Sequence, residues 1–229
     1  KVSNIQKSLD FYVGVLGFEL QQMYGKQAAF ISAGGYHHHI GLNTWESEGG
    51  SPPPPGTTGL FHVAILYPTR ADLADALKRL SANGLQLDGA SDHLVSEALY
   101  LTDPEGNGVE IYADRAREGW AWDGDKVRMG STALDAESVI ASAAGAPAWS
   151  GAPDNSLIGH VHLRVGDVRA AEGFWNDIVG FDTVLNYGGQ AVFLSTGGYH
   201  HHIGANSWQS RGAGPRDKDR TGLQWVELL

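Results

Sequence analysis

The stretch Gly34-Gly-Tyr-His-His-His-Ile-Gly-Leu-Asn-Thr-Trp45 returns as Gly197-Gly-Tyr-His-His-His-Ile-Gly-Ala-Asn-Ser-Trp208. The offset between the two is 163 residues, and it holds without a gap from residues 1–66 to residues 164–229. Two segments that match in one register over this length indicate a duplicated structural unit. We therefore interpret these ranges as two copies of one fold unit, and this duplication decides the fold class.

Each copy carries the signals of one helix followed by three strands. Asn4 and its counterpart Asp167 are typical of helix N-caps, and a glycine ends each predicted helix. The alternating segment before the second copy predicts an additional strand that opens the unit. The complete unit is therefore βαβββ. We predict its strands at residues 19–24, 27–32 and 36–42 of the first copy, and the opening strand of the second copy at 158–165.

A variant of the same unit lies between the two copies. Thr69 is typical of an N-cap, and Gly84 ends the helix that follows it. The opening strand of the first copy is expected before Lys1, and a fourth unit is expected to begin at residues 221–229. These units predict an α+β fold of paired βαβββ modules, whose curved mixed sheets line a cleft. The variant unit's strands are predicted at 60–66, 94–102 and 108–112.

The units suggest a division of the chain into three parts. Residues 1–115 are predicted to be a first module pair that lacks its opening strand. Residues 116–157 are rich in Gly, Ala, Asp and Trp and are predicted to be a linker with a short helix at 135–144. Residues 158–229 are predicted to hold the third module and the opening strand of a fourth.

Composition excludes several classes of function. The net charge of −10 disfavours nucleic acid as a partner, and no apolar run is long enough for a membrane span. There are 10 histidines but no cysteine, so any metal must be held by His, Asp or Glu. The absence of cysteine also fits a reducing compartment, and we expect a cytoplasmic protein.

Three segments resemble the vicinal oxygen chelate superfamily. These are residues 160–181, which resemble its opening strand and helix, residues 96–112, which resemble its closing hairpin, and the twice-present Tyr-His-His-His-Ile-Gly run. The superfamily includes glyoxalase I, bleomycin and fosfomycin resistance proteins and extradiol ring-cleaving dioxygenases. The run is most similar to two-domain catechol 2,3-dioxygenase-type members.

The resemblance implies a metal site of two histidines and one glutamate. His62 matches the second-unit ligand and Glu110 the last-strand ligand, while the first histidine is expected just before Lys1. Two imidazoles and one carboxylate leave adjacent positions open on the metal, which is the facial arrangement of non-haem Fe(II) oxygenases. We therefore expect Fe(II), with Mn(II) or another divalent metal as the alternative, and no organic cofactor. Trp225 stands where the second copy would need its ligand, which argues against a second site.

The resemblance also implies three catalytic candidates. His39 is favoured as the acid–base residue, because His37 and His39 would share one face of a predicted strand. Tyr100, ten residues before Glu110, matches a hydrogen-bonding tyrosine, and His93 lies near another histidine of the extradiol members. Each also has a structural interpretation, with the histidine run as a polar sheet lining, the tyrosine as a core aromatic and His93 as loop surface.

The expected function is a metal-dependent extradiol dioxygenase that acts on a catechol-like aromatic diol with O₂, as in aromatic compound degradation. A glyoxalase-like lyase or isomerase is an alternative, although it would want a further carboxylate near the first histidine run. A bleomycin-resistance-type binding protein, which sequesters a small molecule without metal chemistry, is the alternative from another class. We expect a homo-oligomer in each case.

Overall fold

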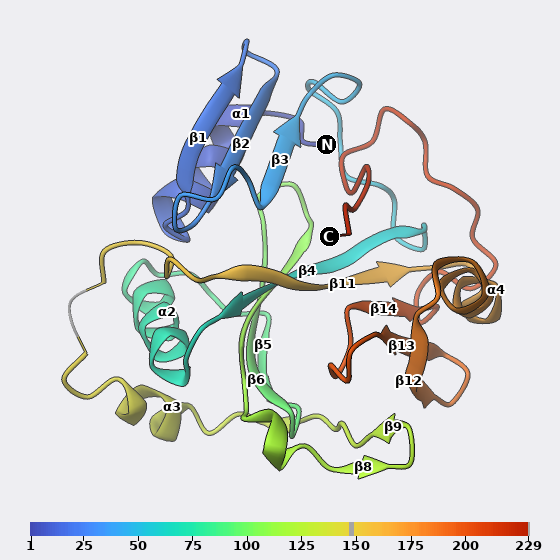
Figure 1. Ribbon diagram of the computed structural model, residues 1–229. Coiled ribbons are helices and arrows are strands. Elements are labelled where there is room, and N and C mark those ends of the chain that lie inside the picture. The colour runs from blue at the N-terminus through green and yellow to red at the C-terminus, as the bar shows by residue number, and fades with distance from the viewer. Residues whose placement is uncertain (147–148, 229) are drawn as a thin grey trace.

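A nine-stranded mixed sheet forms the centre of the molecule. The computed structural model describes residues 1–146 and 149–228 (Figure 1). Its strands are arranged in a three-stranded sheet, the nine-stranded sheet and a two-stranded ribbon, and helices pack beside them. The predicted α+β class with mixed sheets is confirmed. The strand order of the large sheet is β10-β5-β6-β7-β4-β11-β14-β13-β12.

The first unit has the predicted helix and three strands. Asn4 caps the helix by accepting a hydrogen bond from the backbone N–H of Lys7 at 3.0 Å. The helix begins as an α-helix and widens into a π-helical segment, so residues 5–15 hold two helical geometries rather than one. The elements are α1 (Ile5–Leu9), η1 (Asp10–Val15), β1 (Glu19–Tyr24), β2 (Ala28–Ser32) and β3 (Ile40–Asn43).

The second unit contains the longest helix of the described chain. Thr69 accepts a hydrogen bond from the N–H of Asp72 at 3.1 Å, as an N-cap does. The buried side chains of this helix, among them Leu73 and Leu80, lie on one face and pack on the sheet. The elements are β4 (Gly59–Tyr67), α2 (Arg70–Ala82), β5 (Gly89–Asp92), β6 (Ser96–Thr102) and β7 (Gly108–Asp114).

The linker carries more structure than the sequence indicated. The predicted helix forms and is capped by Asp135, but three two-residue strands and a 3₁₀ turn precede it. These elements are η2 (Arg117–Gly119), β8 (Trp122–Asp123), β9 (Lys126–Val127), β10 (Thr132–Ala133) and α3 (Ala136–Ser142).

The third unit repeats the first. Asp167 caps its helix by accepting hydrogen bonds from two backbone N–H groups, and the helix again widens into a π-helical segment. The elements are β11 (Leu157–Arg164), α4 (Val168–Gly173), η3 (Phe174–Val179), β12 (Asp182–Tyr187), β13 (Ala191–Ser195) and β14 (Ile203–Asn206).

The large sheet joins the second unit to the third. β4 and β11 run antiparallel through its centre, with His62 opposite His162, and they lie side by side in the middle of Figure 1. β4 also pairs in parallel with β7, and β11 with β14. The division into 1–115, 116–157 and 158–229 stays a prediction, and hydrogen bonding crosses its borders because strands from its first and last parts pair directly.

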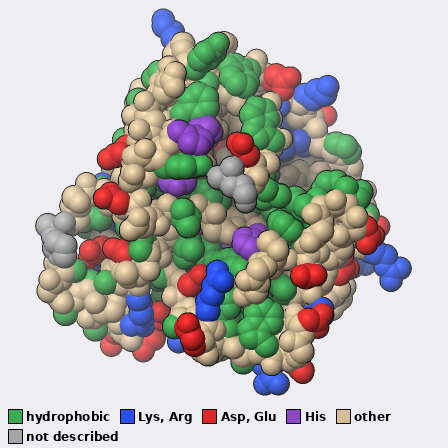
Figure 2. Space-filling view, in the orientation of Figure 1, with side chains coloured by type: hydrophobic (Ala, Val, Ile, Leu, Met, Phe, Trp, Pro, Cys, Tyr) green, Lys and Arg blue, Asp and Glu red, His purple; other side chains and the backbone are tan. Residues whose placement is uncertain are grey.

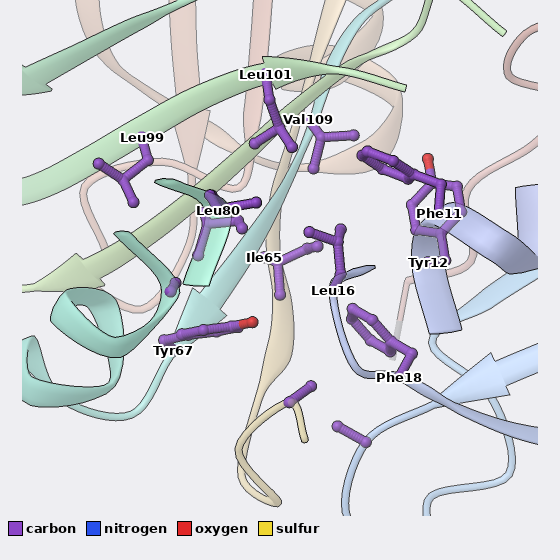
Figure 3. Close-up of a cluster of buried hydrophobic side chains, with 14 of the residues drawn as sticks. Phe11, Tyr12, Leu16, Phe18, Ile65, Tyr67, Leu80, Leu99, Leu101 and Val109 are labelled. Carbon is purple, nitrogen blue, oxygen red and sulfur yellow. The ribbon is translucent and has the colours of Figure 1, made fainter. Parts of the chain in front are cut away.

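The first unit joins the molecule through a shared hydrophobic core. Phe11 and Leu16 of its helical segment belong to the same buried cluster as Leu80 of α2 and Leu99 and Val109 of the large sheet (Figure 3). All five side chains are buried. Burying each large apolar side chain contributes about 1.5–3 kcal/mol, so this contact holds the first unit firmly on the second.

Two predicted strands differ from the structure. The strand expected at residues 36–42 begins only at Ile40, because Gly34 and Gly35 have positive φ and the preceding residues form a turn. The strand expected at 221–229 is absent from its described part, residues 221–228. That segment is tied down by single hydrogen bonds instead, including one in which Asn43 donates to Gln224 at 3.0 Å.

Candidate functional site

Two imidazoles and one carboxylate converge at the centre of the large sheet. The Nε2 atoms of His62 and His160 lie 3.3 Å apart, and Glu110 Oε2 lies 3.0 Å from the first and 3.2 Å from the second. All three residues are buried, with exposed fractions of 6%, 4% and 2%. These three residues form a group able to hold a metal ion. We call it the metal triad.

Strand register brings the triad together. His62 lies on β4, between Glu110 on β7 and His160 on β11. Gly108 pairs with His62 across the β4–β7 ladder, and a Cβ at this glycine would collide with the carbonyl oxygen of Phe61 and lie 3.0 Å from the Cβ of His62. The glycine therefore lets β7 approach closely beside the histidine, with the glutamate two residues farther along the same face.

The donor spacing of the triad fits a metal. Ligand bonds of about 2.1 Å put adjacent donors of an octahedron about 3.0 Å apart, close to the separations of 3.0–3.3 Å observed. The donors are two nitrogens and one oxygen, the set that non-haem iron and related divalent metals use. The buried carboxylate also needs a cation to balance its charge. We therefore conclude that the triad suits a divalent metal.

The protonation states favour metal binding. Burial alone would raise the pKa of Glu110, but the imidazoles of His160 and His62 hold that pKa well below its ordinary value. Burial lowers the pKa of His160 to about 4, against the opposing effect of Glu110. At neutral pH the first is therefore a carboxylate and the second a neutral imidazole, which are the forms that coordinate metals.

His160 is held by packing. Its Nδ1 is buried and has no hydrogen-bond partner among the described residues. Its ring lies 4.1 Å from the ring of His201 and 5.0 Å from that of Tyr112, measured between centroids. Most metal-bound histidines are oriented by a hydrogen bond at the second nitrogen, whereas here contacts with these two tilted rings hold the imidazole.

A cavity of about 340 Å³ opens over the triad. This volume is in the range of small-molecule sites and exceeds what a single aromatic ring fills. On the face of the molecule that Figure 2 shows, a few histidine side chains reach the surface beside hydrophobic side chains, with acidic and basic side chains close by. The apolar walls suit a flat ring, and the polar side chains are gathered near the metal triad. The walls include Phe61, Leu185, Tyr187, Phe193 and Trp208, and the polar lining includes His93, Tyr100, His162 and His201.

Two of the predicted catalytic residues touch each other in this cavity. His93 Nε2 lies 2.6 Å from the hydroxyl of Tyr100, and its Nδ1 lies 2.7 Å from the carbonyl oxygen of Gly130. A carbonyl only accepts, so Nδ1 donates to Gly130, and a ring with this single proton accepts from the tyrosine at Nε2. Tyr100 pairs with Glu110 across β6 and β7, and burial together with that carboxylate raises the tyrosine's pKa above its ordinary value. The hydroxyl therefore stays protonated.

His39 lies elsewhere. It lines a second cavity of about 650 Å³, and its Nδ1 accepts a hydrogen bond from the N–H of Ala33 at 3.2 Å. In the third unit the histidine that lines the metal cavity is His201, the counterpart of His38. The expected alternation does not apply, because both histidine runs are irregular segments before β3 and β14 rather than parts of those strands.

The third donor also differs from the expectation. The family resemblance led us to expect this donor before Lys1, whereas the structure brings His160 of the third unit into the site. The repeat itself contained the signal, because His160 is the counterpart of the expected ligand. The sequence analysis did not identify His162 and His201 as lining residues. For His162 a signal existed, because it lies two residues after His160 and therefore on the same face of the strand. Burial lowers the pKa of both well below the ordinary value, so both rings are neutral at pH 7.

Comparisons with known proteins bear on this site. Residues 1–111 match the model of the Glyoxalase/Bleomycin resistance protein/Dioxygenase superfamily. The chain is 42% identical to a catechol-2,3-dioxygenase from Bacillus subtilis (strain 168), over 100% of this chain and 79% of that protein. It is 35% identical to biphenyl-2,3-diol 1,2-dioxygenase 3 from Rhodococcus globerulus, over 45% of this chain and 54% of that protein.

A solved structure supports the fold. It is that of a candidate dioxygenase from Bacillus subtilis subsp. subtilis str. 168, with a TM-score of 0.60 and 18% identity. The match covers 94% of this chain and 65% of that chain, so this chain spans less than two thirds of that structure. At this identity the likeness concerns the fold alone.

Proposed function

Because the chain belongs to the Glyoxalase/Bleomycin resistance protein/Dioxygenase superfamily, we propose that it is a metal-dependent extradiol dioxygenase that cleaves a catechol-like aromatic diol with O₂. Membership in the family confirms the resemblance found in residues 96–112 and 160–181. The observation that carries the proposal is the buried triad of His62, Glu110 and His160 at the base of a largely apolar cavity. Identity to a catechol-2,3-dioxygenase supports the same substrate class.

His62, Glu110 and His160 would hold the metal. When bound, a divalent metal such as Fe(II) supplies a Lewis acid that acidifies the diol and a redox centre for reaction with O₂. Three protein donors leave the remaining positions free for small ligands. Both atoms of O₂ enter the ring-opened product, so the reaction needs no external reductant. The fit of the donor set supports a divalent metal, and iron with manganese as the alternative is our proposal.

The cavity walls bind and orient the ring. Phe61, Phe193 and Trp208 offer flat aromatic faces, which favour an offset or edge-on contact with a planar substrate. Leu185 and the outer aromatic side chains line the cavity and would reduce the contact of a bound ring with bulk water. A dry site strengthens the electrostatic effects of the polar groups at its base.

We propose that Tyr100 and His93 together accept a proton from the substrate beside the metal triad. The tyrosine hydroxyl donates to His93 Nε2 at 2.6 Å, so its own oxygen keeps a lone pair that accepts a hydrogen bond from a substrate hydroxyl. His93 is anchored by the Gly130 carbonyl and does not need to move. Such a positioned acid–base pair contributes about 10²- to 10⁴-fold to a rate. His39, which lines the other cavity, has no comparable support for a catalytic role.

The two alternatives fit less well. A glyoxalase-like isomerase would want a second carboxylate near the metal, and among the described residues that line the cavity Glu110 is the only acidic one. A binding protein without metal chemistry has no need to bury three convergent donors, because burying an unbalanced carboxylate is unfavourable.

The test is a ring-cleavage assay. The protein is loaded anaerobically with Fe(II), mixed with catechol and exposed to air, and O₂ uptake and a yellow ring-fission product are recorded. We expect both signals, and we expect their loss in His62→Ala and Glu110→Ala. His37→Ala is the matched control, since this exposed histidine lies outside the metal cavity and should leave the rate unchanged. A wild type that binds Fe(II) but consumes no O₂ with a panel of diols would refute the proposal.

A homo-oligomer is also proposed, on the basis of an exposed apolar face in the third unit. Phe174 and Ile178 on η3 have exposed fractions of 48% and 75%. Phe11, which is the counterpart of Phe174 in the first unit, is only 6% exposed because it packs in the core shared with the second unit. A cluster of large apolar side chains on a surface is typical of an interface. Light scattering after size-exclusion chromatography would measure the mass.

The cellular location stays a proposal as well. Among the described residues, no helix is both long and apolar enough to span a membrane. We propose a cytoplasmic protein, because a sequence without cysteine fits a reducing compartment.

A further inference from the structure

A hydrogen-bonded chain of three side chains leads from β7 into the metal cavity. Asp114 Oδ1 lies 2.9 Å from His200 Nε2, and His200 Nδ1 lies 2.8 Å from His201 Nδ1. Asp114 follows Glu110 by four residues on the same strand, so both side chains leave the same face of the sheet. His201 lines the cavity, with its ring centroid 4.1 Å from that of His160. We call Asp114, His200 and His201 the relay chain.

The chemistry of these groups gives the relay chain a direction. A carboxylate only accepts hydrogen bonds, so His200 Nε2 must donate to Asp114. When His200 carries a single ring proton, that proton is on Nε2, and Nδ1 is then an acceptor. The bond of 2.8 Å then requires His201 Nδ1 to donate. The second nitrogen of His201, Nε2, is left with a lone pair.

The middle member of the relay chain is rigidly held. His200 is fully buried, and its ring centroid lies 4.1 Å from that of the tilted Tyr199 ring and 5.1 Å from that of Trp120. Tyr199 is fixed in turn, because its hydroxyl lies 2.7 Å from that of the buried Tyr112. A group held this way loses little freedom when a ligand binds, which is the property of a preorganised site. The linker helps to hold His200 in place through the ring of Trp120.

The first copy of the repeat offers an internal comparison. His37 and His38 form the same Nδ1–Nδ1 contact, also at 2.8 Å. His37 is exposed, however, and no carboxylate is bonded to it among the described residues. The paired histidines are therefore a property of the repeated sequence, and the carboxylate is added only where the third unit meets β7.

We propose that Asp114 and His200 are positioning residues that fix the tautomer of His201, so that its Nε2 presents a lone pair to the metal cavity. This inference rests on the proposed function in one respect, namely that a diol hydroxyl is the group which donates to that lone pair. The tautomer itself depends on the protein alone. The relay chain thereby selects ligands that carry a hydrogen-bond donor on the side of His201.

Nuclear magnetic resonance of the metal-free protein tests the tautomer directly. Histidine is labelled with ¹⁵N, and correlations from the ring protons distinguish a nitrogen that carries hydrogen from one that carries a lone pair. His201 is assigned by the loss of its signals in His201→Gln. We expect hydrogen on Nδ1 and a lone pair on Nε2. Hydrogen on Nε2 of the wild type would overturn the proposal.

Variants of Asp114 test the cause. In Asp114→Asn the new amide donates to His200 Nε2, which reverses both hydrogen bonds and moves the hydrogen of His201 to Nε2. Asp114→Glu keeps a carboxylate and should restore the wild-type tautomer. His37→Gln, in the equivalent pair of the first unit, should leave the His201 signals unchanged. An unchanged tautomer in Asp114→Asn would overturn the role of the carboxylate.

A kinetic measurement connects the tautomer to the proposed function. In the Fe(II)-loaded enzyme, Asp114→Asn should lower kcat for catechol by about 10²- to 10⁴-fold, the range for loss of acid–base assistance, with a smaller change in KM. A reversed tautomer with an unchanged kcat would overturn the positioning role. If the wild type proves inactive, the proposed function fails, and the resonance experiment still decides the tautomer by itself.

Discussion

Replacing His160 by alanine tests which histidine completes the metal triad. In the structure its Nε2 lies 3.3 Å from that of His62 and 3.2 Å from Glu110 Oε2, so its removal leaves two of three donors. The expectation from the family resemblance put the third donor before Lys1, and on that view His160→Ala would leave metal binding intact. The variant therefore separates the two arrangements.

The size of the effect follows from linkage between binding and folding. A metal at 100 times its dissociation constant stabilises the folded state by about 2.7 kcal/mol. For a chain of 229 residues this raises Tm by about 5–10 °C. Loss of a group that merely supports a ligand weakens affinity about 10- to 100-fold, and loss of a ligand should weaken it at least as much. At a 100-fold weaker affinity the gain falls to about 0.4 kcal/mol, or roughly 1 °C.

The assay is differential scanning calorimetry of wild type and variant, each with and without Fe(II) or Mn(II) under anaerobic conditions. The compared quantity is the metal-induced rise in Tm, which removes any destabilisation of the metal-free protein by the substitution itself. His37→Ala is the control and should keep the full rise. A His160→Ala protein that also keeps the full rise would refute the assignment of this ligand.

Three further predictions concern the structure around the triad. In Gly159→Ala the new Cβ would collide with the hydroxyl oxygen of the buried Tyr112, and we expect a loss of about 1–3 kcal/mol in the free energy of unfolding, measured with urea. Tyr199→Phe should lower the free energy of unfolding by about 1–3 kcal/mol, because it leaves the hydroxyl of Tyr112 unpaired. The double variant Tyr112→Phe/Tyr199→Phe should recover part of that loss, and simple additivity of the two single changes would contradict the pairing. Acid should destabilise the metal-free protein between pH 6.5 and about 4, since burial lowers the pKa of His160 to about 4 and the unfolded chain then binds more protons than the folded one. This histidine contributes roughly 3 kcal/mol to the loss in the free energy of unfolding over that pH range. A urea midpoint that rises as the pH falls would refute the reasoning.

Local sequence signals predicted the elements of this fold well. Asn4, Thr69 and Asp167 each cap a helix as expected, because a short side-chain oxygen before an apolar-periodic segment can satisfy a free N–H group. The π-helical segments in both copies were not predicted, since the apolar pattern of a short helix does not distinguish a four-residue from a five-residue hydrogen-bond spacing.

The candidate site was predictable where it depends on one unit. His62 and Glu110 lie on neighbouring strands of the second unit, so the alternation of each strand and the Gly108 contact are enough to bring them together. Tyr100 on β6 and His93, which follows β5 directly, belong to the same unit, and the pairing of β5 with β6 keeps them close together in the cavity. The strand alternation expected around His39 does not apply, because the histidine run is an irregular segment, and His39 lines the other cavity.

The sequence by itself determined that a βαβββ unit is duplicated and where its helices begin, as consequences of the internal repeat, short-range periodicity and capping. The pairing of a histidine and a glutamate of the intervening unit as metal ligands came from the resemblance to the superfamily. Only the tertiary structure decided that the third unit supplies His160 and His201 to the site. The two copies carry nearly the same pattern, so local signals cannot choose between them. The choice depends on which strand pairs with β4, and that is set by burial across the whole molecule.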